Sequence, residues 1–237
     1  MGYTVLGVLY LMVTLPTFPI FLLYLAAVFT YRLWRPKIPV YDLKWAIAWH
    51  NLLCIALSLV SWLAFTWYLM FRADSIYSKR TDGQLQRIFV LYSFSKGLEL
   101  LDTVFMMLRH KGRQISLLHV YHHASMFLLS DCGYRIFPWP CMAVPIAINS
   151  FVHVLVYSYY LATNLGLDVT PYKQYLTQVQ LIQFFIGLPF MYQGIVYHGF
   201  CIYGLLFDLT MIWLFGNFYV RNYLGWFGGR KKKERLE

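Results

Sequence analysis

The sequence HVYHH places three histidines, His119, His122 and His123, inside an apolar stretch from Leu117 to Leu129. Their i, i+3 and i+4 spacing puts all three imidazoles on one face of a helix. Ionisable side chains are costly at bilayer depth and commonly mark a functional site there. Imidazole can act as a nucleophile, as a general base or as a metal ligand. The spacing therefore predicts a reaction centre and leaves iron ligation open.

The composition of the chain is that of an integral membrane protein. Hydrophobic residues make up 59% of its 237 residues and charged residues only 13%, far from the balance of a soluble domain. The net charge of +10 raises the question of nucleic-acid binding. The basic residues stand in short clusters between apolar segments, however, as topology signals do. We therefore expect membrane lipids and no nucleic acid as partners, and interpret the four separate cysteines as small packing residues.

Hydropathy predicts an all-α bundle of seven membrane spans, each near the roughly 20 residues that a bilayer requires. The spans are expected at about 2–30, 46–70, 84–108, 116–129 with some extension, 139–163, 176–197 and 200–220. The third and fourth carry so many polar residues that hydropathy alone would miss them. The first has no basic segment before its apolar run, so we expect a helix rather than a signal peptide. Residues 1–223 are predicted to form one membrane domain and residues 224–237 a short basic cytosolic tail.

The distribution of basic residues predicts the orientation of this bundle. An odd number of spans puts the two termini on opposite sides of the membrane. With the C-terminus in the cytosol, most lysines and arginines fall on the cytosolic side, including the cluster from Arg221 to Arg235. The positive-inside rule therefore favours a cytosolic C-terminus, although the bias is smaller without the tail.

With this orientation, polar residues from five spans fall at one level in the cytosolic half of the bundle. Single residues have simpler explanations: Gln180 as a contact between helices, Glu99 as the ion-pair partner of Lys96, and Tyr157 and Tyr160 as interfacial tyrosines. Five coincidences at one depth favour a shared site. Besides the three histidines, the set is Lys96, Glu99, Asp102, Thr103, Asn149, His153, Tyr157, Tyr160, Thr177, Gln180, Gln183, Asn217 and Tyr219.

Two further histidines and one aspartate are not assigned to this set. His50 and His198 stand at or near span ends, where a packing or interfacial histidine is the simplest interpretation. Asp208 lies within the last span, and an intramembrane carboxylate needs a partner that the sequence does not name.

A polar chamber that opens to the cytosol and continues into the apolar halves of the spans suits an amphiphile with a charged head and a long tail, such as an acyl-CoA. Neutral imidazole is a nucleophile toward a thioester. The pattern therefore predicts a cytosol-facing acyl-CoA tunnel with acyl-imidazole chemistry available, although a cluster of topology signals would resemble a phosphate site. The candidates for binding the coenzyme phosphates are Arg109, Lys111, Arg113 and Lys173.

Five motifs in order give the chain a resemblance to a known family. They are KGLELLDT from Lys96 to Thr103, HVYHH from His119 to His123, NSFVHVLVYSYY from Asn149 to Tyr160, TQVQLIQ from Thr177 to Gln183 and FGNFYVRNY from Phe215 to Tyr223. Over these motifs the chain resembles the very-long-chain fatty acid elongases, the condensing enzymes of elongation in the endoplasmic reticulum. Val156 departs from the pattern, since the family usually has methionine there, and this is a packing change.

The resemblance implies a 3-oxoacyl-CoA synthase. Malonyl-CoA would condense with an acyl-CoA to give 3-oxoacyl-CoA, carbon dioxide and CoA, without a bound cofactor or metal. His122 would take the acyl group from CoA, and His153, His119 and His123 would move protons or stabilise the enolate. Asn149 would orient the substrate or bind the oxyanion. The charge network supporting the imidazoles would consist of Lys96, Glu99 and Asp102.

Two details of the resemblance concern substrate and location. Gln114 and the NSF sequence before His153 are similar to the polyunsaturated branch, so we expect a polyunsaturated acyl-CoA as substrate. The terminal KKKERLE would place Lys232 and Lys233 at the positions of a dilysine retrieval signal if the last two residues were not native. We expect a multi-pass protein of the endoplasmic-reticulum membrane with a lumenal N-terminus. The bulky residues expected to close the tail pocket are Phe127, Trp139, Met142 and Phe190.

Two other functions share parts of this pattern. A histidine-box di-iron desaturase or hydroxylase also acts on membrane acyl chains, but its iron site needs about eight nitrogen-type ligands, and the chain has seven histidines with one box. A seven-span transporter or receptor with a midplane polar cluster would bind without reacting. As an elongase, the chain would work with the reductases and the dehydratase of the elongation cycle, and a homodimer is a further expectation.

Overall fold

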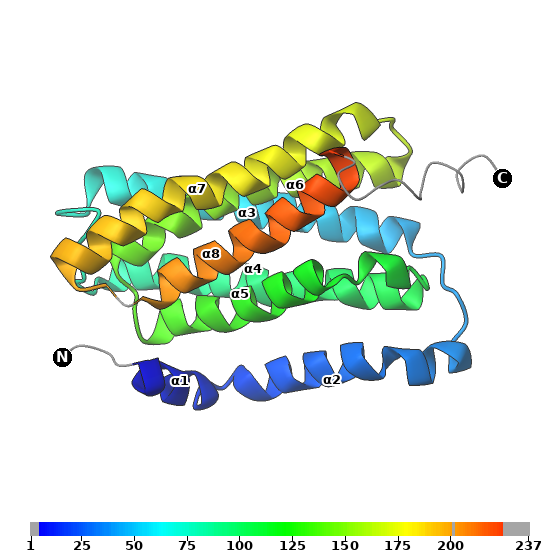
Figure 1. Cartoon of the computed structure of the whole chain (residues 1–237), viewed down its shortest axis with the longest axis horizontal. Helices are drawn as coiled ribbons and strands as arrows, with labels where there is room; N and C mark the ends of the chain where they lie inside the picture. Colours follow the sequence, from blue (N-terminus) through cyan, green and yellow to red (C-terminus); the bar gives the residue numbers. More distant parts are fainter. Residues whose placement is uncertain (1–4, 201, 225–237) are drawn as a thin grey trace. The chain divides into compact units, whose positions relative to one another are not determined.

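The computed structural model describes residues 5–200 and 202–224, and the regular structure in these two ranges is helical throughout (Figure 1). The all-α prediction is confirmed. The long helices are α1 Val5–Val13, α2 Phe18–Trp34, α3 Lys44–Phe71, α4 Gly83–Leu108, α5 Leu117–Arg135, α6 Pro140–Leu165, α7 Lys173–His198 and α8 Tyr203–Tyr219. Short 3₁₀ helices lie at η1 Arg35–Lys37, η2 Gly112–Gln114 and η3 Thr170–Tyr172, and a π-helical segment, η4, covers Val220–Leu224.

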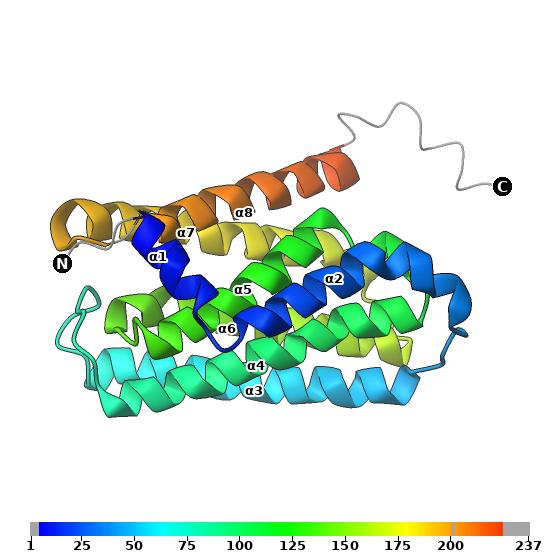
Figure 2. The ribbon, with the colours of Figure 1, turned by 90° about the horizontal axis from the view of Figure 1, so that it is seen from below.

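The chain divides into two compact units, residues 1–167 and 168–237. In the first unit α3 packs along α6 and against α4, α5 packs on α4, and α1 and α2 pack on α5 (Figure 2). The second unit pairs α7 with α8. One membrane domain over residues 1–223 stays a prediction. The predicted basic tail and retrieval signal lie outside the described residues, apart from Leu224.

Within the described residues, four helical segments are long and apolar enough to cross a membrane: α3, α6, Thr170–His198 with α7, and Tyr203–Leu224 with α8. The α1–α2 pair adds a fifth if its two parts count as one span. α4 and α5 are long helices as well, but they contain the ionisable residues of the predicted site, which lower their hydropathy. The structure therefore supports a multi-pass membrane protein, whereas the number of seven spans stays a prediction.

The first predicted span is not one continuous helix. α1 and α2 are bent by 84° across a short break. Pro16 lies in this break, and Pro19 lies in the first turn of α2. Proline lacks a backbone N–H and clashes with the preceding helical turn, but it is well tolerated where a helix begins. The prolines therefore end α1 and begin α2, which corrects the expectation of a single helix over 2–30.

The beginning of α5 is fixed directly before the histidine motif. Ser116 is the N-cap, and its Oγ accepts a hydrogen bond from the backbone N–H of His119 at 3.2 Å. At its other end α5 continues beyond the predicted limit to Arg135, whose Nε lies 2.8 Å from Oδ1 of Asp131 one turn earlier. Thr17 donates to the other carboxylate oxygen of Asp131 at 2.7 Å. These contacts fix the register of α5 and give each carboxylate oxygen of Asp131 a hydrogen-bond partner.

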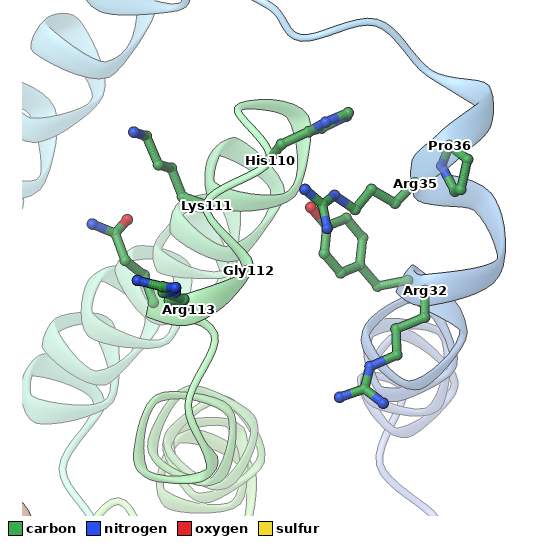
Figure 3. Close-up of a pocket in the computed structure, with 9 residues that line it drawn as sticks. Arg32, Arg35, Pro36, His110, Lys111, Gly112 and Arg113 are labelled. Carbon is green, nitrogen blue, oxygen red and sulfur yellow. The ribbon is translucent and has the colours of Figure 1, made fainter. Parts of the chain in front are cut away.

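The end of α2 and the connection from α4 to α5 line an open cavity of about 1020 Å³ (Figure 3). The hydroxyl of Tyr31 donates to the carbonyl of Met107 at 3.2 Å and holds the end of α2 against α4. We call this cavity the basic pocket, because lysine and arginine side chains line it and no acidic residue of the described chain does. Its ionisable lining residues are Tyr31, Arg32, Arg35, His110, Lys111 and Arg113.

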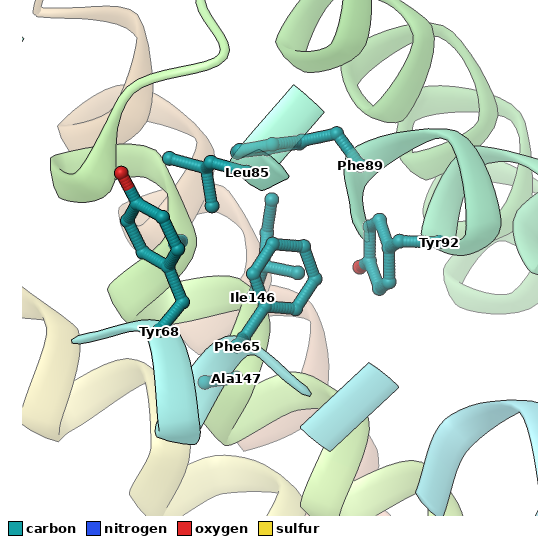
Figure 4. Close-up of a cluster of buried hydrophobic side chains, with 8 residues drawn as sticks. Phe65, Tyr68, Leu85, Phe89, Tyr92, Ile146 and Ala147 are labelled. Atoms are coloured by element: carbon teal, nitrogen blue, oxygen red, sulfur yellow. The ribbon is translucent and has the colours of Figure 1, made fainter. Parts of the chain in front are cut away.

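One apolar core contains side chains from α3, α4 and α6 (Figure 4). Phe65 of α3 and Leu85 and Phe89 of α4 are fully buried, and the rings of Phe65 and Phe89 pack edge to face with centroids 5.1 Å apart. Ile146 contributes from α6. A Cβ at Gly133 of α5 would lie 3.3 Å from the Phe89 ring, so the missing side chain lets α5 approach α4 closely. The motif on α4 is thereby held against its neighbours.

Candidate active site

The motif KGLELLDT lies on α4 and begins with a buried ion pair. Nζ of Lys96 lies 2.7 Å from Oε1 of Glu99, and each side chain is 2% exposed. The two residues stand three positions apart, so they lie on one helical face. Charges withdrawn from solvent are costly unless they are paired and hydrogen-bonded. This pair therefore needs further partners, and α6 supplies one.

His153 of α6 completes the cluster. Its Nδ1 lies 3.2 Å from Nζ of Lys96 and 3.2 Å from Oε1 of Glu99. An imidazole held at one nitrogen has a fixed ring orientation, and the other nitrogen is left for chemistry. Lys96, Glu99 and His153 thus form one buried group from two helices.

His122 of α5 faces His153. The ring centroids are 5.8 Å apart, and the ring planes are nearly perpendicular at 89°. Nδ1 of His122 is enclosed and has no hydrogen-bond partner among the described residues. One imidazole of the pair is therefore anchored by charged neighbours, whereas the other keeps a nitrogen without a partner.

His119 and His123 lie beside this pair and are held by a different contact. Nε2 of His119 lies 2.8 Å from Oγ1 of Thr103, which in turn lies 2.9 Å from the hydroxyl of Tyr24 on α2. The ring of His123 is 4.3 Å from that of His119 and 5.4 Å from that of His122, measured between centroids. All three histidines of the motif therefore lie together, as the spacing predicts.

Asp102 connects α4 to α3 and α6. Its Oδ1 lies 2.9 Å from Nε2 of His50, and its Oδ2 accepts a hydrogen bond of 2.6 Å from the hydroxyl of Tyr157. Sγ of Cys54 lies 3.5 Å from the same His50 nitrogen. A carboxylate with bonds on both oxygens is held in one orientation. Tyr160, one turn beyond Tyr157, is 41% exposed and lies at the edge of the cluster.

Asn149 of α6 is linked to α4 through a tyrosine. The hydroxyl of Tyr92 donates to Oδ1 of Asn149 at 3.0 Å, and Nζ of Lys96 lies 4.9 Å from the centroid of the Tyr92 ring. Both Asn149 and Tyr92 are buried. The predicted orienting amide is therefore bonded within the same polar region as the Lys96 cluster.

The predicted polar residues of α7 and α8 belong to the second unit and are described there alone. Thr177 is buried, and its hydroxyl donates to the carbonyl of Lys173 at 3.1 Å. Gln183 donates to the carbonyl of Gln180 at 3.0 Å. Asn217 is half-buried on α8. The amide of Gln178 donates to the hydroxyl of Tyr219 at 2.7 Å and joins the two helices.

Asp208 is also buried in the second unit. A Cβ at Gly187 would lie 2.7 Å from its Oδ2, so the glycine of α7 makes room for the carboxyl group. That oxygen has no hydrogen-bond partner among the described residues. The partner that an intramembrane carboxylate needs is therefore not found in this part of the chain.

Three of the four predicted phosphate ligands belong to the first unit. Lys111 and Arg113 line the basic pocket, whereas Arg109 ends α4 outside its lining. Lys173 begins α7 in the second unit.

Over residues 10–234 the sequence matches the model of the ELO family, described as the GNS1/SUR4 family. The chain belongs to this family. It is 33% identical to very long chain fatty acid elongase 2 of Rattus norvegicus over 241 residues, which cover 94% of this chain and 82% of that protein. It is 40% identical to very long chain fatty acid elongase 4 of Homo sapiens over 140 residues, covering 56% and 45%. It is 34% identical to very long chain fatty acid elongase 5 of Xenopus tropicalis over 185 residues, covering 70% and 59%.

The resemblance to the elongase family is thus confirmed, and the polyunsaturated branch stays a prediction. Within this ELO-family chain, the structure adds His50, Cys54, Tyr24 and Tyr92 to the polar cluster. The sequence predicts a position for His50 near a span end and outside this cluster, but α3 begins at Lys44, so His50 lies within the helix. The sequence signal that indicates a functional role for His50 is its position inside a long apolar helix. The tyrosines resemble ordinary packing residues until the helices are placed.

Proposed function

We propose that this chain is a fatty acid elongase that condenses malonyl-CoA with a long-chain acyl-CoA to give 3-oxoacyl-CoA, carbon dioxide and CoA. The observation that carries the proposal is the pair of imidazoles. His122 has an unpartnered Nδ1, and His153 is anchored by Lys96 and Glu99. In a member of the ELO family, these two rings supply a nucleophile and a proton donor within one enclosed site.

In the first half-reaction His122 attacks the thioester carbonyl carbon of acyl-CoA. A C–N bond forms and the C–S bond breaks, so the acyl group stays on the imidazole and CoA leaves as a thiol after taking up a proton. A nitrogen without a hydrogen bond keeps its lone pair for this attack. The absence of a partner for Nδ1 of His122 among the described residues supports the role.

In the second half-reaction malonyl-CoA loses carbon dioxide. The electrons of the broken C–C bond form an enolate, whose carbon attacks the acyl carbonyl, and the C–N bond to His122 breaks. We propose that Lys96 donates to Nδ1 of His153, so that the ring proton lies on Nε2 and can be donated to the enolate oxygen. Over the whole reaction one proton is consumed and ends on the sulfur of CoA.

The remaining groups of the cluster are proposed to position the reacting groups or to transfer protons. His119, held by Thr103, and His123 beside it are proposed to move the proton toward the departing thiolate. Asn149 is proposed to bind the carbonyl oxygen under attack. Asp102 is proposed to support the imidazoles through the fold, since both its oxygens bond to neighbouring helices.

The finer features of the substrate are also proposals. We propose a polyunsaturated acyl chain in a tunnel that opens to the cytosol, with the chain end near Phe127, Trp139, Met142 or Phe190, and polar contacts from α7 and α8. Phe127 is buried in an apolar cluster with Tyr24 and Leu100, which suits a closing residue. The coenzyme phosphates would meet Arg109, Lys111, Arg113 or Lys173. The protein would lie in the endoplasmic-reticulum membrane, as a monomer or homodimer, with the reductases and the dehydratase of elongation as partners.

The test is incubation of the purified chain with labelled malonyl-CoA and a panel of acyl-CoAs of different length and unsaturation. We expect a labelled 3-oxoacyl-CoA, with polyunsaturated substrates preferred. The absence of a labelled product with every acyl-CoA would contradict the proposed enzyme. A product formed only from saturated acyl-CoAs would contradict the proposed polyunsaturated preference but not the proposed condensation reaction.

A further inference from the structure

The basic pocket gathers positive charge from two segments that are far apart in the sequence. Arg32 and Arg35 come from the end of α2 and from η1, while Lys111 and Arg113 come from the connection between α4 and α5. In Figure 3, Arg35 extends toward this connection, and His110 extends from it toward α2. None of the four cations forms an ion pair with a described carboxylate. Cations without ion-pair partners that line one pocket create a positive potential, which favours an anion there.

His110 ends α4 in a conformation that favours glycine. Its φ is 55°, and among the described residues other than glycine it alone has a positive φ. The N–H groups of His110 and Lys111 donate to the carbonyls of Met107 and Met106 at 3.0 and 2.8 Å. This is the Schellman motif, in which glycine usually occupies the left-handed position. A histidine there is disfavoured by the backbone alone.

The imidazole of His110 also has an unsatisfied nitrogen. The ring lines the basic pocket, and its Nε2 is enclosed without a hydrogen-bond partner among the described residues. Enclosed polar atoms without partners are costly and commonly have a functional explanation. A glycine at this position would avoid both costs. The strained backbone and the orphaned nitrogen together indicate that the ring serves a ligand with acceptor oxygens.

A phosphate group matches this lining. Guanidinium groups bind phosphate oxygens through paired hydrogen bonds, and lysine adds a point charge. The volume of about 1020 Å³ also leaves room for the group that the phosphate is attached to. Next to the arginines, Phe29 and Leu33 of α2 are 76% and 72% exposed. An amphiphile could therefore place its phosphate in the pocket and its hydrocarbon along α2.

We infer that the basic pocket is a binding site for an organic phosphate, with Arg32, Arg35, Lys111 and Arg113 as charged contacts and His110 as a further hydrogen-bond donor. Two molecules carry this chemistry in the membrane of an elongase: an anionic phospholipid, and the bisphosphorylated adenosine end of coenzyme A. The second rests on the proposed function, whereas the first does not.

The test uses the full chain in a neutral detergent and two probes. Binding of phosphatidate is measured by native mass spectrometry, and binding of adenosine 3′,5′-bisphosphate by titration calorimetry. The variant Arg35→Gln/Arg113→Gln removes two charges from opposite walls of the pocket. The matched control Lys37→Gln/Lys44→Gln removes two exposed charges outside its lining. Each lost charge-assisted hydrogen bond weakens binding roughly tenfold, so the first variant should lose at least about tenfold for one probe and the control less than about twofold.

His110→Gly separates loss of the ligand from loss of folding. Glycine suits a φ of 55°, so this variant should weaken the same probe while its Tm stays unchanged or rises. Loss of phosphatidate binding assigns the pocket to a lipid headgroup, and loss of bisphosphate binding assigns it to the coenzyme. Unchanged binding of both probes in Arg35→Gln/Arg113→Gln, or an equal loss in the control, would overturn the inference. Neither probe requires condensation, so failure of the labelled malonyl-CoA assay would remain a separate result.

Discussion

Replacing Lys96 with methionine would leave Glu99 as a buried carboxylate without its ammonium partner. The two side chains are each 2% exposed and 2.7 Å apart. Removing one member of such a pair typically costs about 3–5 kcal/mol. His153 can partly replace the lost charge, because its Nδ1 lies 3.2 Å from Oε1 of Glu99. We therefore expect the lower part of this range, about 3 kcal/mol.

The double variant Lys96→Met/Glu99→Met should behave differently. Replacing both members of a buried pair with apolar residues of similar volume is often neutral or stabilising. Each kcal/mol corresponds to about 2–4 °C in Tm for a chain of this size. Lys96→Met alone should therefore lower the Tm by on the order of 10 °C, and the double variant should recover most of that loss. A double-mutant cycle over Lys96 and Glu99 measures the interaction energy of the pair.

The rate of condensation should stay low in the double variant even though its stability recovers. Both variants change the partners of Nδ1 of His153. Lys96→Met leaves the Glu99 carboxylate alone beside Nδ1, which favours the ring proton on that nitrogen, and the double variant leaves the ring free to change tautomer and orientation. Positioned acid–base groups contribute about 10²–10⁴-fold to a rate, so both variants should lose at least about 100-fold. Thermal unfolding in detergent and the rate with labelled malonyl-CoA give the two readouts. Lys44→Met, an exposed change, is the control.

Two outcomes would contradict this role of the Lys96–Glu99 pair. A double variant with full activity would show that the pair does not position His153. A Lys96→Met protein with unchanged Tm would show that Glu99 does not depend on Lys96, despite the distance between them.

Three further predictions concern other parts of the first unit. Tyr157→Phe removes the 2.6 Å hydrogen bond to Asp102 and should cost about 1.5–3 kcal/mol of stability; Tyr160→Phe, at the exposed edge, is the control, and equal effects on thermal unfolding would contradict the assignment. Phe127→Ala should lengthen the products of elongation if this ring closes the tail pocket, and an unchanged chain-length profile would remove it from that role. A backbone N–H bond at the beginning of α4 holds the pKa of Asp82 below its usual range. Its charged form therefore stabilises the fold above the ordinary carboxyl pKa, and this contribution is lost as the pH falls through the lowered value. The Tm difference between wild type and Asp82→Asn should shrink over that acidic range, and a constant difference would contradict the cap.

Much of the site could be predicted because a helical face is a property of local sequence. The spacing of His119, His122 and His123 places them together on any α-helix, and the polar face of α4 follows in the same way from Lys96 and Glu99. The structure confirms that both sets lie together with His153. The unusual polarity of two long helices was therefore informative.

Contacts between helices could not be predicted from the same pattern. His50 bonds to Asp102 because α3 packs against α4, and nothing local to His50 states that packing. Arg32 and Arg35 looked like topology signals, but the end of α2 meets the connection after α4 and makes a pocket there. The 84° bend after α1 could not be predicted either, since a proline predicts an interruption of the helix but not its angle.

The role of His122 as carrier of the acyl group can be measured from the mass of the protein after rapid mixing with an acyl-CoA in the absence of malonyl-CoA. We expect one acyl group per active chain, located on the peptide that contains His122, together with release of one CoA. His122→Ala should show neither. An acyl adduct that forms at the normal rate in His122→Ala, or CoA release that requires malonyl-CoA in the wild type, would contradict this role.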